Sequence, residues 1–247
     1  MDTEQTDRTV AKLRHPTSTQ AKPEAPSIVT IVCQGPTQQS YRVLLDDYNR
    51  EIPHAELWIL NKAARYLRGD LLWVMDDLES ERRKSGEYFG DLMAAGLPIM
   101  TCSTGHDSMQ FVPPHMHAKI FEYPLLQVID YWGEVSLLAS RGYLEHAAQS
   151  LIRQEGLKCA AYFHNSLPYM LAYAGFIGVK AVHLFGADYT YGNQALREDG
   201  RANAEYWIGM LRATGVQVRL SSDTTLLSQS KQPWFYGFAR QPVIEGL

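Results

Sequence analysis

Seven short, mostly apolar segments, separated by segments of helical character, constrain the fold of this chain more than any other feature. The first run, Ile28-Val29-Thr30-Ile31-Val32-Cys33, is rich in β-branched residues and lacks polar alternation, which is typical of a strand buried on both faces of a parallel sheet. Strands that alternate with helices predict one α/β domain on a doubly wound, mostly parallel sheet. We predict these strands at 28–33, 57–61, 71–76, 98–102, 119–123, 180–186 and 216–220.

The segments between the strands are expected to form helices and loops. Helices are predicted at about 39–50, 78–95, 167–177 and 202–214, with a further helical region at 125–153 that Gly133 interrupts. The polar segments 103–117 and 189–201 are predicted to be lid loops.

The ordered domain is expected to span 27–228. Residues 1–26 are rich in Thr, Gln, Lys and Pro, a composition that predicts a disordered N-terminal arm. Residues 229–247 include Pro233-Trp234-Phe235-Tyr236-Gly237-Phe238, an aromatic tail that we expect to pack on the domain rather than to bind a partner.

Charge and cysteine content narrow the class of function. The chain has 23 Lys and Arg against 27 Asp and Glu, so its net charge of −4 does not favour nucleic acid as a partner. No apolar run reaches the roughly 20 residues of a membrane span, and the N-terminus lacks an apolar signal core. Cys33, Cys102 and Cys159 have no CxxC spacing, which indicates reduced thiols in a cytoplasmic protein. Homo-oligomerisation is left open.

Small and polar residues follow the predicted strands where each strand ends. Because the carboxyl ends of parallel strands meet at one edge of a sheet, where α/β proteins hold ligands, these residues are candidates for one site. The turn Gly35-Pro36-Thr37 follows the first strand and offers backbone and hydroxyl groups to a phosphate, unless it is an ordinary strand-to-helix turn. Asn61 ends the second strand and offers its amide to a base or ribose, or else caps a helix.

A second group of polar residues lies where the helix 167–177 is predicted to begin. Asn165 and Ser166 are typical helix-capping residues, and the helix N-terminus also favours anionic ligand groups. His164 precedes them and is a candidate catalytic residue. One of the loop histidines His106, His115 and His117 is an alternative general base, because histidine titrates near neutral pH.

The strand 180–186 is followed by Asp188, Tyr189 and Tyr191. A carboxylate at a strand end accepts hydrogen bonds from ribose hydroxyls or acts as a base, whereas the alternative is an Asx turn that stabilises the loop. If Asp188 faces a ligand it contributes little to stability, so Asp188→Asn is expected to leave the melting temperature nearly unchanged.

Asp76 and Asp77 end the third strand. Adjacent carboxylates are candidates for holding Mg²⁺ through oxygen ligands, with positions left for phosphate groups. The alternative is that Asp77 caps the next helix while Asp76 is solvated.

Together these motifs resemble the nucleotide-binding fold shared by bacterial sialyltransferases and the archaeal 6-hydroxymethylpterin diphosphokinase family, which similar phage-encoded proteins of unassigned role also show. The sialyltransferase Gly-Pro-Ser turn is similar to Gly35-Pro36-Thr37, and the Asn that ends their second strand is matched by Asn61. Their Thr-Ser-Gly-x-Tyr-Met and Gly-Ile-Asp-Phe-Tyr motifs resemble residues 165–170 and 186–190. The resemblance spans about 28–227 and implies a Rossmann-like fold. The sialyltransferases carry their catalytic His in a lid before the last helix, whereas residues 189–203 contain no histidine here.

The resemblance implies a transferase that takes a nucleotide or nucleotide-sugar donor. The leading hypothesis is a glycosyltransferase-like reaction in which Asp188 or His164 deprotonates an acceptor that the sequence does not identify. One alternative is an ATP-dependent and Mg²⁺-dependent pyrophosphokinase, with Asp76, Asp77 or Asp188 at the metal. Another is a non-catalytic nucleotide-binding or phage structural protein, located in the bacterial host cytoplasm. The nucleotide-binding residues implied are Gly35, Pro36, Thr37, Asn61, Asn165, Ser166, Tyr189 and Tyr191.

Overall fold

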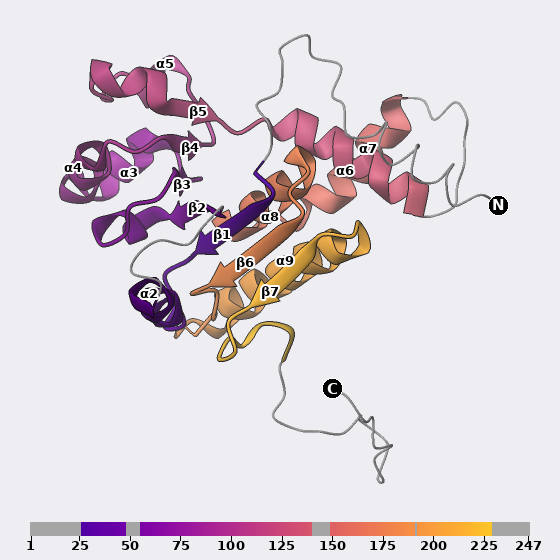
Figure 1. The fold of residues 1–247 in the computed structure, drawn as a ribbon. Helices are drawn as coiled ribbons and strands as arrows, with labels where there is room; N and C mark the ends of the chain where they lie inside the picture. The colour runs from indigo at the N-terminus through magenta and orange to yellow at the C-terminus, as the bar shows by residue number, and fades with distance from the viewer. Residues whose placement is uncertain (1–25, 48–54, 140–148, 191, 229–247) are drawn as a thin grey trace.

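A computed structural model describes residues 26–47, 55–139, 149–190 and 192–228 of the chain (Figure 1). The aromatic tail and all of the N-terminal arm except Pro26 lie outside these residues, so both stay predictions.

The described residues form one seven-stranded sheet in which every pair of neighbouring strands is parallel. All seven predicted strands are confirmed, and each predicted boundary lies within two residues of the observed one. The strands are β1 (Ile28–Val32), β2 (Ala55–Leu60), β3 (Leu71–Val74), β4 (Ile99–Thr101), β5 (Ile120–Glu122), β6 (Ala181–Phe185) and β7 (Gln217–Leu220).

The strand order, β5-β4-β3-β2-β1-β6-β7, places the start of the domain near the middle of the sheet. The chain runs outward from β1 to β5 and then returns to the other side of β1 as β6, so the direction of winding reverses between β1 and β6. Val32 of β1 pairs in register with Ile59 of β2 and with Phe185 of β6. The residues that follow these three strands therefore emerge together at one edge, at the topological switch point where doubly wound sheets bind ligands.

Helices cover both faces of the sheet (Figure 1). Alternate residues of the central strands face opposite sides: Val29 and Ile31 pack with α6, α8 and α9, whereas Val32 packs with α2, α3 and α4. The helices are α2 (Gln38–Asp47), α3 (Leu78–Lys84), α4 (Gly86–Ala95), α5 (His106–Met109), α6 (Leu125–Ala139), α7 (Gln149–Ala160), α8 (Ser166–Ile177) and α9 (Gln194–Ala213), with short 3-10 helices η1 (Asn61–Arg65), η2 (Pro114–Lys119) and η3 (Leu226–Ser228).

Three predictions about the helices are wrong in detail. The region 78–95 is two helices, because the extended Ser85 ends α3 and its hydroxyl accepts from the Tyr88 N–H to start α4. Gly133 does not interrupt α6: a Cβ there would lie 2.0 Å from the Ile152 carbonyl oxygen, so the glycine permits close contact with α7. The last helix begins at Gln194, capped by the Asn193 side chain, so most of the predicted lid 189–201 is helical.

The predicted lid 103–117 is also largely structured, because it contains α5 and most of η2. The Ser108 hydroxyl donates to Asp77 of the α3 cap, and the Arg82 guanidinium lies 3.8 Å from the Phe111 ring centroid. These contacts hold the segment against α3.

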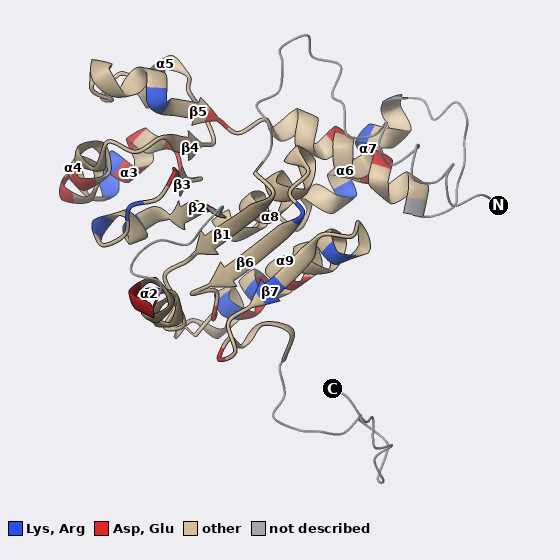
Figure 2. Ribbon diagram, viewed as in Figure 1, with Lys and Arg blue, Asp and Glu red and all other residues tan. Residues whose placement is uncertain are grey.

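Charged side chains of both signs are interspersed on α3 and α9, whereas α4 carries only acidic ones (Figure 2). Within the part of the chain that the structure describes, no helix combines the length and apolar character required to cross a membrane.

Candidate functional site

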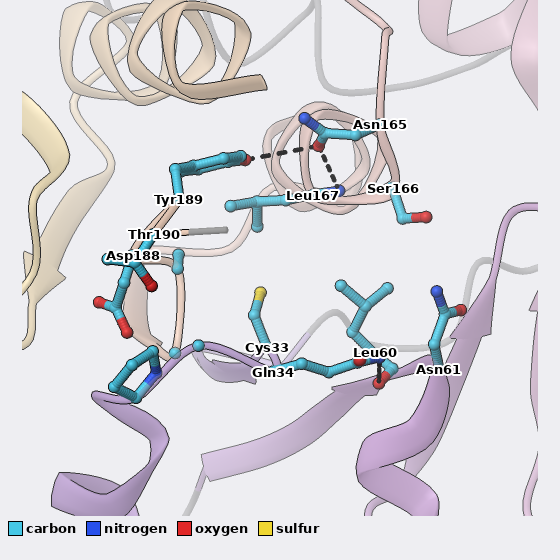
Figure 3. Close-up of a pocket in the computed structure, with 14 residues that line it drawn as sticks. Cys33, Gln34, Leu60, Asn61, Asn165, Ser166, Leu167, Asp188, Tyr189 and Thr190 are labelled. Atoms are coloured by element: carbon cyan, nitrogen blue, oxygen red, sulfur yellow. Dashed lines mark hydrogen bonds between the residues drawn. The ribbon is translucent and has the colours of Figure 1, made fainter. Parts of the chain in front are cut away.

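A cavity of about 420 Å³ opens at the carboxyl ends of β1, β2 and β6, beside the start of α8 (Figure 3). Gly35, Asn61, Ser166 and Asp188, which are far apart in sequence, all line it, so the prediction that they border one cleft is confirmed. The volume lies within the range typical of small-molecule sites. The other lining residues are Cys33, Gln34, Pro36, Leu60, Asn165, Leu167, Gly186, Ala187, Tyr189 and Thr190.

A buried clamp between Asp188 and Thr37 closes one side of this cavity. The Thr37 N–H donates to Asp188 Oδ2 and the Thr37 hydroxyl donates to Asp188 Oδ1, both at 2.6 Å. The Thr37 oxygen also accepts from the Gly186 N–H at 2.9 Å. Asp188 is only 2% exposed and Thr37 only 7% exposed, so these bonds satisfy a carboxylate that has little access to water.

The glycines beside the clamp are there because nothing larger fits. The Gly35 N–H donates to the Gly186 carbonyl at 2.6 Å, and a Cβ on Gly35 would lie 2.6 Å from both that oxygen and Asp188 Oδ2. Gly186 has a φ of +70°, and a Cβ there would lie 2.4 Å from the Cys33 carbonyl oxygen. The turn after β1 and the turn after β6 therefore lie in direct backbone contact.

As a result, the hydrogen-bond donors of the turn Gly35-Pro36-Thr37 are bonded to other protein groups and are not free for a ligand. The Gly35 N–H is used by Gly186, proline has no N–H, and both donors of Thr37 are used by Asp188. The geometry therefore differs from the predicted phosphate cradle: Gly35 and Pro36 shape the cavity wall, and Thr37 lies behind it without being among the lining residues.

Two asparagine side chains lie on the other walls. Asn165 caps α8, and its Oδ1 accepts from the Leu167 N–H at 3.2 Å and from the Tyr189 hydroxyl at 3.5 Å. Asn61 follows β2 with a left-handed φ of +45°. Within the described residues, Asn61 Oδ1 and Asn165 Nδ2 are buried without a hydrogen-bond partner. Unpaired polar atoms are rare inside proteins, so their presence beside a cavity indicates groups that a ligand or water satisfies.

The start of α8 gives the cavity a local positive potential. Ser166 begins this helix of 12 residues and, with Leu167, borders the cavity. Pro168, in the first turn, has no N–H to leave unpaired. Among the described residues that line the cavity none is Lys, Arg or His, so within this part of the lining the helix N-terminus is the source of positive potential.

Cys33 forms part of the apolar floor, with its sulfur pointing into the space below Tyr189 and Leu167 (Figure 3). Burial, aided by the Asp188 charge, raises the pKa of its thiol to about 12. The thiol is therefore protonated at neutral pH and unsuited to nucleophilic catalysis. Sequence reasoning missed several lining residues, although each lies within two positions of a residue that it did select: Cys33, Gln34, Leu60, Leu167, Ala187 and Thr190.

His164 and the two tyrosines are the next predicted site residues to compare with the cavity. His164 is exposed and is not among the lining residues, although it directly precedes Asn165. Tyr189 lines the cavity, whereas Tyr191 lies outside the described residues.

The predicted metal ligands at the end of β3 have protein partners. Asp77 accepts from the Ser80 N–H at 2.9 Å as the cap of α3, and Asp76 lies 3.5 Å from the Lys84 ammonium. Neither lines the cavity, and among the described residues no three His, Cys, Asp or Glu side chains gather as metal ligands do. Metal binding by this pair stays a prediction.

Comparison with known proteins finds similarity only to solved structures. No family model matches the chain, and no curated protein matches it in sequence. Among solved structures, it is similar to the sialyltransferase CstII from Campylobacter jejuni in complex with cytidine-5'-monophosphate, with 14% identity, a TM-score of 0.43 and 81% of each chain covered. A complex of the same enzyme with CMP-3FNeuAc gives 15% identity, a TM-score of 0.41 and coverage of 78% of this chain and 79% of that one. Because the identity is this low and the TM-scores lie below 0.5, these similarities do not indicate the function of this chain.

Proposed function

We propose that this protein is a transferase that binds a nucleotide-bearing donor in the cavity between β1 and β6. The observation that carries the proposal is the position of two amides with unpaired buried atoms, Asn61 and Asn165, beside a helix N-terminus at the topological switch point. Amides recognise the edges of bases and the hydroxyls of ribose, and a helix N-terminus favours phosphate.

The charges around the cavity support one orientation of this donor. The phosphate lies at the start of α8, near the Ser166 hydroxyl, because the lining residues that the structure describes include no cationic side chain and the turn Gly35-Pro36-Thr37 has no donor left. The nucleoside then extends over the apolar floor of Cys33 and Leu60 toward Asn61.

The proposed reaction is transfer of a glycosyl group from the donor. An acceptor hydroxyl oxygen bonds to the anomeric carbon, the bond between that carbon and the phosphate oxygen breaks, and the nucleotide leaves with the electron pair. The acceptor proton has to move to a base. Both Asp188 oxygens already accept from Thr37, so we assign this role to His164, which is exposed and directly precedes the cavity residue Asn165.

The test is a thermal-shift panel of CMP, UDP, GDP, ADP and ATP, each with and without Mg²⁺. A nucleotide at a hundred times its dissociation constant stabilises the folded protein by about 2.7 kcal/mol, which such a scan detects. We expect one nucleotide to raise the melting temperature without Mg²⁺, and Asn61→Ala to abolish that rise. The matched control is Gln110→Ala, which removes an exposed amide just after α5 and should leave the shift intact.

The same panel distinguishes the other functions. Stabilisation by ATP that requires Mg²⁺, followed by AMP release, would replace glycosyl transfer with pyrophosphoryl transfer. If none of the five nucleotides stabilises the wild-type protein, the proposed function is wrong.

A further inference from the structure

Tyr189 has a backbone conformation that a bulky residue rarely adopts. Its φ is +48°, in the left-handed region, and it lies in the cavity wall directly after Asp188. A left-handed conformation is strained for an L-residue with a Cβ, so such a residue persists only where its surroundings hold it in place.

Hydrogen bonds fix the loop immediately before Tyr189. The Asp188 side chain is held by the two donors of Thr37, at 2.6 Å each. The Thr224 hydroxyl donates to the Ala187 carbonyl at 3.0 Å, and the Thr225 hydroxyl donates to the Asp188 carbonyl. The loop is thus anchored on one side to the start of α2 and on the other to the segment after β7.

The anchored loop places the Tyr189 ring in the cavity wall. The ring crosses one side of the cavity toward α8, and its hydroxyl points at Asn165 Oδ1 at 3.5 Å (Figure 3). The same Oδ1 accepts from the Leu167 N–H, so Asn165 is oriented by two donors from different elements. At 3.5 Å the tyrosine bond is long, and such bonds at apo sites often tighten when a ligand binds.

We propose that Asp188 and Tyr189 are positioning residues for the ligand. The clamp between Asp188 and Thr37 holds Tyr189 in its left-handed conformation, and the Tyr189 hydroxyl orients the Asn165 amide at the cavity. This assigns to Asp188 a role different from the catalytic base predicted from the sequence. The effect on ligand affinity rests on the proposed function, whereas the effect on the Tyr189 backbone does not.

The first test is structural and needs no ligand. Crystal structures of Thr37→Val and Thr37→Ser would be compared with that of the wild type. Valine removes the hydroxyl at nearly constant shape, and we expect Tyr189 to leave the left-handed region and its hydroxyl to move away from Asn165. Serine keeps the hydroxyl, and we expect it to keep the wild-type conformation. If Tyr189 keeps a positive φ in Thr37→Val, the clamp does not position it and the inference is overturned.

The second test measures affinity for CMP by titration calorimetry. Tyr189→Phe removes only the hydroxyl, and we expect a nearly unchanged melting temperature with CMP binding weakened about tenfold, equivalent to about 1.4 kcal/mol. The matched control is Tyr123→Phe, which removes a hydroxyl that donates to the Tyr169 carbonyl at 3.2 Å and does not line the cavity. We expect this variant to bind CMP as the wild type does.

The outcomes separate the two proposals. If the wild type binds CMP and Tyr189→Phe binds it equally well, the positioning inference is wrong while nucleotide binding stands. If the wild type does not bind CMP, the proposed function fails for this nucleotide. The Tyr189 conformation in Thr37→Val still decides whether the clamp positions Tyr189. Should Thr37→Val not fold, Tyr189→Phe tests the role of the hydroxyl in a variant that leaves the clamp intact.

Discussion

Replacement of Asp188 by asparagine should destabilise the folded protein, contrary to the expectation from sequence. The carboxylate is 2% exposed and accepts two hydrogen bonds of 2.6 Å from Thr37. Hydrogen bonds to a charged group contribute about 1.5–3 kcal/mol each. The asparagine oxygen can still accept from the Thr37 N–H, and the threonine hydroxyl can turn to accept from the new NH₂ group. We therefore expect a partial loss of about 2 kcal/mol, which lowers the melting temperature by about 4–8 °C in a domain of this size.

Urea denaturation followed by tryptophan fluorescence measures this loss, since Trp58, Trp73, Trp132 and Trp207 are fully buried. The matched control is Glu122→Gln. Glu122 Oε2 also accepts an N–H and a hydroxyl from one threonine, Thr104, at 2.9 and 2.8 Å, but at an exposed site. We expect the control to change the free energy of unfolding by less than about 0.5 kcal/mol. If Asp188→Asn changes the free energy of unfolding as little as this control does, the buried clamp is not a stabilising contact.

Three further measurements test other parts of the structure. Gly35→Ala should unfold at lower urea, because its Cβ would lie 2.6 Å from Asp188 Oδ2 and from the Gly186 carbonyl; Gly90→Ala, where a Cβ meets nothing within 4 Å, should be neutral or slightly stabilising, and equal behaviour of the two would contradict this reading. The hydrogen bond from Arg82, with Arg83 also beside the carboxyl, lowers the pKa of Glu79 to about 2. The stability that this ion pair contributes is therefore fully present above pH 4.5 and is lost as the pH falls through about 2. Glu79→Gln should make the free energy of unfolding depend less on pH in this window, and an unchanged pH dependence would argue against the ion pair. Alkylation at about pH 8 should modify the exposed Cys102 and spare Cys33, whose thiol pKa burial raises to about 12; peptide mass spectrometry that finds Cys33 modified first would show that the cavity floor is open.

The sheet could be predicted from sequence because each buried strand is a short apolar run bounded by polar or turn residues. The same reasoning brought Gly35, Asn61, Ser166 and Asp188 to one edge, since all four follow strands or begin a helix in a parallel sheet. Position at a strand end, however, does not show which way a side chain points. The clamp joins residues 151 positions apart, and no local pattern indicates that Thr37 and Asp188 satisfy each other rather than a ligand.

The errors in the helices have a related physical cause. Gly133 can break a helix or permit close contact with another, and only the position of Ile152 in α7 decides between the two. The first turns of α9 are polar and were predicted to be a loop. They are stabilised by side-chain pairs four residues apart, Gln194 with Glu198 and Arg201 with Glu205, at 2.7 Å each. Such polar pairs give no apolar periodicity.

Where a nucleotide binds is the question that tests the central claim most directly. Crystals of the wild-type protein would be soaked with the nucleotide that raises its melting temperature most. We expect density in the cavity between β1 and β6, with the phosphate at the start of α8 beside Ser166 and the nucleoside near Asn61. A second cavity of about 450 Å³ lies between η1 and α4, where Arg65 and Arg68 line the wall. Nucleotide density there, with the cavity at the strand ends empty, would contradict the account.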